Sequence, residues 1–265
     1  MSKDLKVALL PFSIEWNQKD SNLRKLEELL QSIHPQTDLL ILPETFSTGF
    51  PVDMTKEEVR ELAERNTGKT VDFIKEMAFK YKMAICGSFI ADTGGSLYNR
   101  VFFIEPSGEE YFEDKRHLFT MAGENKVFSS GLKRMKVRYR GWNIAMVVCY
   151  DIRFPVWCRN RNNEYDLLIS IANWPASRVS AWDTLLKARA IENQAYVCGV
   201  NCTGEDSKGN LYNGSSDAID FKGKSVKVGI EGSEIQYATL SRERLDSFRE
   251  KFPAWKDADD FLLYK

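Results

Sequence analysis

The chain has 265 residues, of which 43% are hydrophobic, so it can bury a sizeable core and is not expected to be disordered. Its 37 lysines and arginines nearly balance 38 aspartates and glutamates, which argues against nucleic acid or an anionic membrane as a partner. No apolar run approaches the roughly 20 residues of a membrane span, and the charged start with its short apolar run is unlike a signal peptide.

Helical patterns alternate with strand-length apolar runs in the first part of the chain. Strands are expected at residues 7–10, 39–42 and 83–90. Ser21 is expected to cap the first helix, whose apolar face carries Leu23, Leu26, Leu30 and Ile33. Thr55 and Glu58 form the capping-box pattern of a second helix, and a third helix is expected to start at Thr70.

Hairpins and buried strands make up most of the remaining chain. Two hairpins are expected, at residues 97–105 with 111–114 and at 137–139 with 144–148. A helical stretch lies between two continuous apolar strands, in the order 167–171, 182–195 and 196–200. The last segment is expected to hold strand pairs around 221–224 and 231–233, a charged helix at 242–251 and an aromatic tail.

The strands are of two kinds, and this mixture indicates the fold class. Continuous apolar runs imply burial on both faces, whereas hairpin-linked strands imply antiparallel pairing. Helices must cover a sheet that is buried on both sides, so we expect an α/β sandwich with mixed sheets. Without a linker, repeat or break in composition, residues 1–265 are expected to form one domain. The tail, from about residue 253 to 265, is expected to dock on the body or on a neighbouring subunit.

Cys149 is the sharpest chemical feature of the sequence. It follows the apolar run 144–148 directly, and polar residues after it are expected to open a turn and a helix. A thiol at such a bend is exposed at the sheet edge, near a helix N-terminus that favours the thiolate, as suits a nucleophile. The alternative is a small buried hydrophobic residue, as most cysteines are. The other four cysteines lack this setting, and the absence of CxxC spacing favours a reduced, cytoplasmic compartment.

Glu44 and Lys115 also stand at the ends of expected strands. Glu44, directly after Pro43, either caps backbone N–H groups or acts as a base, and Lys115 is either a solvated charge or a catalytic one. Strand ends converge in α/β sheets, and a thiol nucleophile needs a base. No histidine follows Cys149, so Glu44 is the candidate base. Lys115 is the candidate cation that would stabilise the oxyanion formed during attack. Glu124 is either a surface carboxylate or a partner of this group.

Three stretches carry a family resemblance: LLILPETF around Glu44, EDKRHLF around Lys115 and VVCYDIRFP around Cys149. In this order and in these contexts they resemble the nitrilase superfamily of carbon–nitrogen hydrolases. The resemblance implies a four-layer α-β-β-α sandwich without a metal or organic cofactor, assembled as a homodimer or a higher homo-oligomer. It also implies that Glu44, Lys115 and Cys149 are catalytic, and that Glu124 matches the family's second glutamate beside the lysine.

Within the superfamily, CYDIRFPVWCRN, ISIANWPASR and NCTGEDSKGNLYNGSSDAID are most similar to the omega-amidase branch. This resemblance implies that the terminal amide of 2-oxoglutaramate or 2-oxosuccinamate is hydrolysed through a cysteine thioester. Alternatives are a hydrolase of N-carbamoyl amines, nitriles or aliphatic amides, and a catalytically silent binding protein on the same fold. A redox-sensing thiol, with Cys158 as the resolving cysteine, is a further alternative.

A few residues are candidates for contact with such a small-molecule amide. The backbone N–H of Tyr150 is a candidate oxyanion donor beside Lys115. Arg153 either binds a substrate carboxylate in a fork or forms a structural salt bridge beneath the bend. Phe119 and Trp174 either wall the pocket or belong to the core, and Asn173 stands in the stretch that resembles the family's substrate-side loop.

Overall fold

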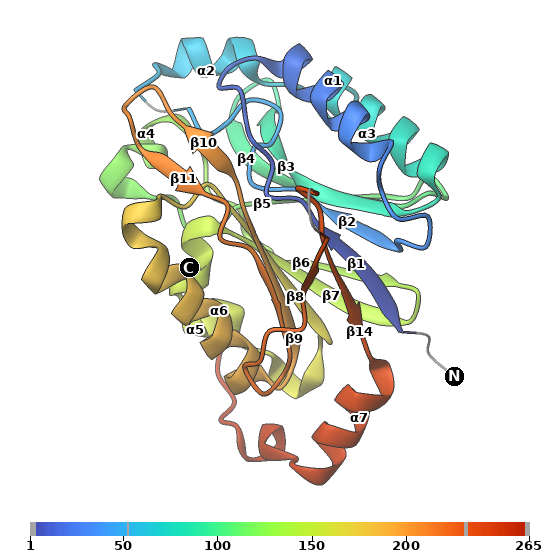
Figure 1. Cartoon of the computed structure of the whole chain (residues 1–265). Coiled ribbons are helices and arrows are strands. Elements are labelled where there is room, and N and C mark those ends of the chain that lie inside the picture. The colour runs from blue at the N-terminus through green and yellow to red at the C-terminus, as the bar shows by residue number, and fades with distance from the viewer. Residues whose placement is uncertain (1–3, 52, 231–232, 263–265) are drawn as a thin grey trace.

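Two β-sheets lie face to face between outer layers of helices in the computed structural model, which describes residues 4–51, 53–230 and 233–262 (Figure 1). One sheet has seven strands, in the order β13 (Val228–Gly229), β14 (Gln236–Leu240), β1 (Leu5–Leu9), β2 (Leu39–Ile41), β3 (Ala84–Asp92), β4 (Leu97–Ile104) and β5 (Glu110–Asp114). The other has five, in the order β12 (Asp217–Ile219), β9 (Tyr196–Asn201), β8 (Leu167–Ala172), β7 (Trp142–Val148) and β6 (Met135–Tyr139). A separate hairpin joins β10 (Thr203–Glu205) and β11 (Leu211–Asn213).

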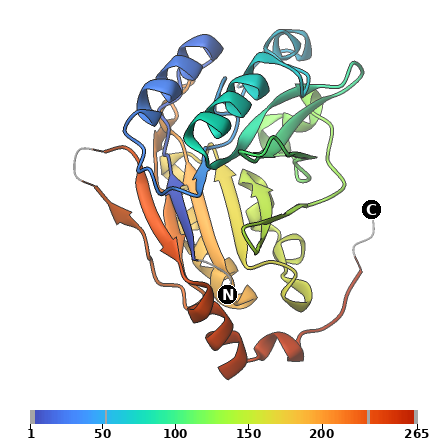
Figure 2. The ribbon, with the colours of Figure 1, turned by 90° about the vertical axis from the view of Figure 1, so that its right-hand side faces the viewer.

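The helices cover the outer faces of both sheets. Figure 2 shows the two long helices of the first outer layer side by side, α1 (Lys19–Leu30) and α3 (Lys69–Tyr81). The opposite outer layer is formed mainly by α6 (Val179–Asn193). The remaining α-helices are shorter: α2 (Lys56–Leu62), α4 (Glu124–Val127), α5 (Pro155–Cys158) and α7 (Arg242–Lys251). None of the helices within the described ranges is long and apolar enough to cross a membrane.

Apolar cores between successive layers hold the sandwich together. Between the sheets, Leu9 of β1 belongs to the same core as Ile144 of β7 and Ile169 of β8. A second core lies between the seven-stranded sheet and helices α1 and α3, where Leu26 is buried, and a third holds Leu186 of α6 against the five-stranded sheet. Successive side chains of a strand point to opposite faces, so the continuous apolar runs supply two cores at once. The expected four-layer α-β-β-α sandwich with mixed sheets is confirmed.

Parallel pairs in both sheets bring strand ends to common edges. Strands β1, β2 and β3 are parallel neighbours in one sheet, and β7, β8 and β9 are parallel neighbours in the other. The register pairs Val148 of β7 with Ile171 of β8, so the chain leaves both strands at the same edge. Residues that follow these strands are therefore close in space although they are far apart in sequence.

The N-terminus of α1 differs from the expectation. The helix begins at Lys19, so Ser21 lies inside its first turn and is not the cap. The side chain of Asn22 stabilises the N-terminus of α1 instead. It accepts the Glu15 N–H at 2.8 Å and donates to the carbonyls of Glu15 and Ser47. A side chain that reaches a neighbouring loop has replaced the local cap.

The other two helix starts agree better with the sequence. α3 begins at Lys69, one residue before the expected Thr70, whose N–H donates to Oε1 of Glu64 at 3.3 Å. The capping box of α2 is confirmed, since Thr55 and Glu58 exchange hydrogen bonds between side chain and backbone. A capping box is satisfied within one turn, and local sequence is therefore enough to predict it.

The C-terminal segment follows the expected order of elements. Helix α7 covers the charged segment 242–251. Around the turn at 221–224, β12 pairs with the returning chain: Ile219 forms an antiparallel bridge with Ser225, and the Val226 N–H donates to the Ala218 carbonyl at 2.7 Å. Of the pair expected around 231–233, residues 231 and 232 lie outside the described residues. In the tail, the Trp255 N–H donates to Oε1 of Gln194 at 3.1 Å, and the Arg161 guanidinium lies 5.3 Å from the centroid of the Phe261 ring. The described part of the tail thus contacts its own chain.

Candidate active site

Four ionisable side chains from separate segments lie close enough to interact electrostatically, and one of them lines a pocket. Glu44 follows β2, Lys115 follows β5, Cys149 follows β7, and Glu124 begins α4. Cys149 is half-buried and lines the pocket, whereas the other three are buried. The structure thus brings together the residues that follow the three strands. Glu124 is not a surface carboxylate but a buried partner of this group.

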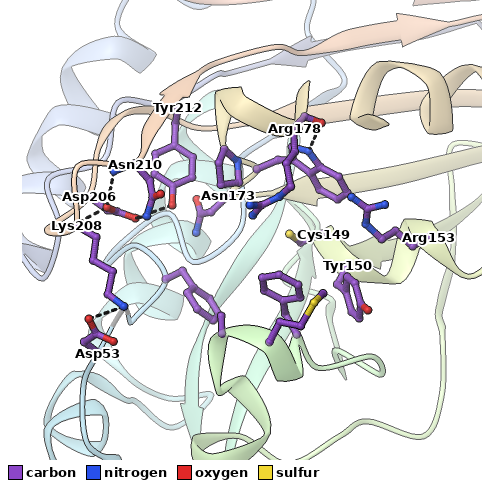
Figure 3. A pocket seen from close by; sticks show the side chains of 16 residues that line it. Asp53, Cys149, Tyr150, Arg153, Asn173, Arg178, Asp206, Lys208, Asn210 and Tyr212 are labelled. Carbon is purple, nitrogen blue, oxygen red and sulfur yellow. Dashed lines mark hydrogen bonds and ion pairs between the residues drawn. The ribbon is translucent and has the colours of Figure 1, made fainter. Parts of the chain in front are cut away.

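Cys149 occupies a strained bend between β7 and a short 3₁₀ helix, η2 (Cys149–Arg153). Its φ of +47° lies in the left-handed region, which is unfavourable for a residue with a side chain. The Asp151 carboxylate holds this bend, because it accepts the Val148 N–H at 3.0 Å and the His117 N–H at 2.8 Å. Asp151 thereby ties the bend to the loop that carries Lys115, while the thiol is turned towards the pocket (Figure 3).

The expectation that a helix N-terminus favours the Cys149 thiolate is wrong. Burial raises the pKa of the Cys149 thiol well above its ordinary value, the negative charge of Glu44 raises it further, and the Lys115 charge only partly opposes them. The η2 helix is too short to supply a large opposing dipole. Cys149 therefore stays a protonated thiol at neutral pH and needs a base when it reacts.

Three donors hold the carboxylate of Glu44. Its Oε1 accepts from Lys115 Nζ at 3.0 Å and from Asn99 Nδ2 at 2.7 Å, and its Oε2 accepts the Asn173 N–H at 2.8 Å. Asn99 lies in β4 of the seven-stranded sheet, and Asn173 follows β8 of the five-stranded sheet. One expected role of Glu44 was to cap backbone N–H groups, and its Oε2 does accept one such N–H. Its Oε1 instead contacts the charged Lys115 side chain.

The loop after β2 is shaped to hold Glu44. The next residue, Thr45, has a φ of +43°, and its N–H donates to Oγ of Ser88 on β3 at 2.8 Å. The hydroxyl oxygen of Thr45 accepts from Nδ2 of Asn173 at 2.9 Å. Neighbouring strands therefore hold both the backbone and the carboxylate at this position, which limits their movement.

Lys115 lies between two carboxylates. Its Nζ is 3.0 Å from Oε1 of Glu44 and 2.9 and 3.0 Å from the two oxygens of Glu124. Burial alone would lower the pKa of Lys115, but the charges of Glu124 and Glu44 outweigh it and raise the pKa well above its ordinary value. Lys115 is therefore a buried, permanently charged ammonium and not a solvated surface charge.

Glu124 is fixed by the loop in front of it. Its Oε2 accepts the Phe119 N–H at 2.5 Å, in addition to the bonds with Lys115. Burial raises the pKa of Glu124, and the Lys115 charge opposes that shift. Because Phe119 also lines the pocket, Glu124 connects the buried lysine to the pocket wall.

Aromatic side chains form much of the pocket wall. Phe50, Phe119, Tyr150, Trp174 and Tyr212 all line it, and the ring centroids of Phe119 and Tyr150 are 5.0 Å apart. The N–H of Tyr150 precedes the first hydrogen bond within η2, so the helix itself provides no acceptor for it. Of the residues singled out as substrate contacts, the structure places Tyr150, Phe119 and Trp174 in this wall, together with Asn173 and Arg153.

The acidic side chains of the pocket already have partners. Asp53 forms an ion pair with Lys208 at 2.5 Å. The carboxylate of Asp206 accepts from the Tyr212 hydroxyl at 2.9 Å and from Nδ2 of Asn210 at 2.9 Å. These contacts appear as dashed lines in Figure 3. The acidic groups of the pocket are therefore not available to neutralise its arginines.

Two arginines of the pocket, Arg153 and Arg178, form no ion pair within the described ranges. The salt bridge considered for Arg153 is thus absent there, and its guanidinium lies 4.7 Å from the centroid of the Trp174 ring instead. The guanidinium of Arg178 lies 5.7 Å from the centroid of the Phe119 ring. Both side chains are exposed, so their charges face the open pocket.

Sequence reasoning missed Asn99 and Arg178. Asn99 is a buried amide in the otherwise largely apolar strand LYNRVFFI, and a buried polar group needs a partner, which is a usable signal. Arg178 is the last residue of the stretch ISIANWPASR, but its residue type alone does not distinguish it from a surface arginine.

Two further side chains that could take part in chemistry, His117 and Cys158, have structural contacts with Asp151. His117 Nδ1 lies 2.8 Å from Oδ1 of Asp151, and its ring stacks on Phe154. Cys158 is buried, and its thiol donates to the Asp151 carbonyl at 3.5 Å, which gives no support to a resolving role. In the part of the chain that the structure describes, no cluster of three or more histidine, cysteine or acidic side chains could hold a metal ion.

A thiol, an ammonium and two carboxylates gathered at the strand ends of an α-β-β-α sandwich define a hydrolase of the nitrilase superfamily. More specifically, the chain belongs to the carbon–nitrogen hydrolase family, whose model matches residues 6–250. The resemblance found in the three sequence stretches is thereby confirmed.

Comparison with individual proteins agrees with this assignment. The chain is 42% identical over 260 residues to a Yersinia enterocolitica protein named omega-amidase YafV, covering 98% of each chain. It is 30% identical to a 2-oxoglutaramate amidase of Bacillus subtilis, covering 95% of this chain and 96% of that one. XC1258 of Xanthomonas campestris, a CN-hydrolase superfamily protein solved with an arsenic adduct in its active site, superposes with a TM-score of 0.92. That structure is 39% identical and covers 99% of this chain and 100% of its own.

Proposed function

We propose that this protein is an omega-amidase, which hydrolyses the terminal amide of a small 2-oxo dicarboxylate monoamide to the 2-oxo acid and ammonia. The observation that carries the proposal is that Cys149 shares its pocket with two arginines that lack an ionic partner within the described residues. Such a pocket suits an anionic amide. The near full-length similarity to omega-amidase YafV and to a 2-oxoglutaramate amidase supports the same substrate class.

In the first half-reaction Glu44 is the base. It takes the Cys149 proton as the sulfur attacks the amide carbon, and the carbonyl oxygen becomes an oxyanion. The Lys115 ammonium and the Tyr150 N–H stabilise that oxyanion, and losing one such donor typically costs about 10²–10³-fold in rate. The protonated Glu44 then gives its proton to the amide nitrogen, the C–N bond breaks, and ammonia leaves an acyl thioester on Cys149.

In the second half-reaction the same carboxylate activates water. Glu44 accepts a proton from the water that attacks the thioester, and the oxyanion again forms beside Lys115. Collapse of this intermediate breaks the C–S bond, releases the 2-oxo acid and returns the proton to the Cys149 sulfur. Glu124 keeps Lys115 in place and is supported in this role by its two short contacts to Nζ.

The pocket charge predicts that a 2-oxo acid amide is preferred to an amino acid amide. The 2-oxo group is neutral, whereas the 2-amino group of glutamine carries a positive charge. That charge would approach Arg153 and Arg178, and like charges repel by about 4 kcal/mol at 4 Å for an effective dielectric of 20. Discrimination of about 10²-fold in kcat/KM is therefore expected, because each 1.4 kcal/mol corresponds to roughly tenfold.

Ammonia release from a panel of substrates tests the proposal. We expect 2-oxoglutaramate to be hydrolysed with the highest kcat/KM, ahead of glutamine, N-carbamoyl-β-alanine and propionitrile. A preference for the N-carbamoyl amine or the nitrile would assign another chemistry of the family. Absence of turnover on every member, with Cys149 intact, would favour a catalytically silent binding protein.

We further propose that residues 1–265 form one domain, that the protein is cytoplasmic, and that it assembles as a homodimer or larger homo-oligomer. The core between the sheets, which includes both Leu5 and Leu245, supports one folding unit. The five free thiols support a reducing compartment. A single thermal unfolding transition and a dimer mass in sedimentation experiments are the expected results.

A further inference from the structure

The two arginines of the pocket are held in different ways. Arg153 belongs to η2, the short helix that begins with Cys149, and its guanidinium lies over the Trp174 ring. Arg178 ends a separate 3₁₀ helix, η4 (Ala176–Arg178), and its guanidinium lies over Phe119, which belongs to another loop. Arg178 therefore reaches from the loop after β8 towards the loop that precedes Glu124.

The backbone of Arg178 is fixed while its side chain is free to bind. Its carbonyl accepts from Nε1 of the buried Trp174 at 2.8 Å, and its N–H donates to the Pro175 carbonyl at 3.0 Å. In Figure 3 the Arg178 side chain extends into the middle of the pocket, and Arg153 lies at its edge. The anchored backbone reduces the freedom that is lost when the guanidinium orders around a ligand.

The rest of the pocket leaves the Arg178 charge unbalanced. Asp53 is paired with Lys208, and the Asp206 carboxylate is occupied by donors from its own hairpin. A planar guanidinium matches a carboxylate with two parallel hydrogen bonds. Because the reacting amide must lie at Cys149, the carboxylate at the other end of a short acyl chain lies further into the pocket, where the Arg178 side chain extends (Figure 3).

We propose that Arg178 is the residue that recognises the carboxylate of the substrate and so selects an acidic amide over a neutral one. Arg153 stays on the Trp174 ring and adds positive charge at the edge of the pocket. This inference rests on the proposed function and deepens it, because it assigns the contact that decides the substrate class. It also places the main anchor on Arg178, a position that sequence alone did not single out.

Steady-state kinetics on two amides of equal chain length test the assignment. For Arg178→Met we expect kcat/KM on 2-oxoglutaramate to fall about 10–100-fold, mainly through KM, since a hydrogen-bonded charge is lost. The same variant should change kcat/KM on neutral pentanamide less than about threefold. The kcat/KM of Arg178→Lys on 2-oxoglutaramate should lie between those of Arg178→Met and wild type, because lysine keeps the positive charge but cannot form two parallel hydrogen bonds to the carboxylate. Arg138→Met, at an exposed arginine on β6, is the matched control and should behave as wild type on both amides.

Binding measured without turnover provides an independent readout. In the Cys149→Ala background, calorimetry should show that Arg178→Met weakens binding of 2-oxoglutarate by about 10–100-fold, and that Arg153→Met weakens it less. A larger loss for Arg153→Met, or equal losses on 2-oxoglutaramate and pentanamide for Arg178→Met, would overturn the assignment of Arg178. A wild-type enzyme that hydrolyses pentanamide but not 2-oxoglutaramate would instead contradict the proposed function itself.

Discussion

The backbone N–H of Asn173 donates to Oε2 of Glu44 at 2.8 Å. Asn173 follows β8 of the five-stranded sheet and Glu44 follows β2 of the seven-stranded sheet, so this hydrogen bond joins strand ends of the two sheets. Cys149 follows β7, the parallel neighbour of β8. The position of the proposed base, Glu44, relative to the proposed nucleophile, Cys149, is therefore set by how the two sheets pack.

Replacing the thiol tests its role directly. Cys149→Ala should abolish ammonia release, because the proposed nucleophile is lost. The circular dichroism spectrum should be unchanged, because Cys149 is half-buried at a pocket and its replacement by alanine removes few packing contacts. Mass spectrometry of the wild type during turnover should find an acyl adduct on Cys149. The buried cysteines, among them Cys158 with its pKa raised to about 12 by burial, should remain unmodified. Activity above a tenth of wild type in Cys149→Ala would place the nucleophile elsewhere.

Removing the buried cation should affect both rate and stability. Lys115→Met leaves Glu44 and Glu124 without the charge that lies within 3.0 Å of each, and breaking a buried ion pair typically costs about 3–5 kcal/mol. Urea unfolding should show this loss for Lys115→Met and no comparable loss for Cys149→Ala, while both variants are inactive. If Lys115→Met is as stable as wild type, the cluster does not depend on that charge.

Asn99 is expected to act through Glu44 as a positioning residue. Asn99→Leu removes the donor 2.7 Å from Oε1, so the carboxylate loses one of its three contacts. We expect kcat to fall about tenfold with KM nearly unchanged, since a typical hydrogen bond to a charged group contributes about 1.5–3 kcal/mol. The fall in kcat should be larger for Asn99→Asp, which places a negative charge next to Glu44. A change confined to KM or to thermal stability would mean that Asn99 has only a structural role.

The alkaline pH dependence should be flat. Burial raises the pKa of Cys149, and the two glutamate charges raise that of Lys115, so both groups keep their protons up to a pH above their ordinary values. A group with a raised pKa loses its proton later as pH increases, so kcat/KM should not rise between about pH 7.5 and 9.5, where an ordinary thiol ionises. A pH–rate profile with a rise centred near about 8.5 would instead indicate reaction through a preformed thiolate.

Chelators should leave the activity unchanged. The proposed acyl transfer uses the Lys115 ammonium, where a metal hydrolase would use a Lewis acid. Overnight dialysis against EDTA and re-assay with 2-oxoglutaramate should give the untreated rate. Loss of turnover that zinc restores would contradict the assignment of the oxyanion partner to Lys115.

Much of the fold could be predicted because its signals are local. Apolar runs of strand length, the capping box at Thr55 and the hairpin around Gly108 each depend on residues a few positions apart. The mixture of buried and hairpin-linked strands was enough for the α/β sandwich. The prediction that Ser21 caps the first helix failed because the helix end is stabilised by a contact far along the chain. The Asn22 side chain donates to the carbonyl of Ser47, in a loop that is distant in sequence but adjacent in space.

The order of residues along the chain was enough to propose the reacting groups, since Glu44, Lys115 and Cys149 each follow an apolar strand in a recognisable stretch. The protonation states of these groups depend instead on how the segments pack. Burial, and not a helix dipole, controls the Cys149 thiol, and the second carboxylate beside Lys115 comes from α4. The same holds for Arg178, whose importance depends on which acidic groups elsewhere in the pocket are already paired. Electrostatic effects act through distance and desolvation, and both are known only once distant segments have packed together.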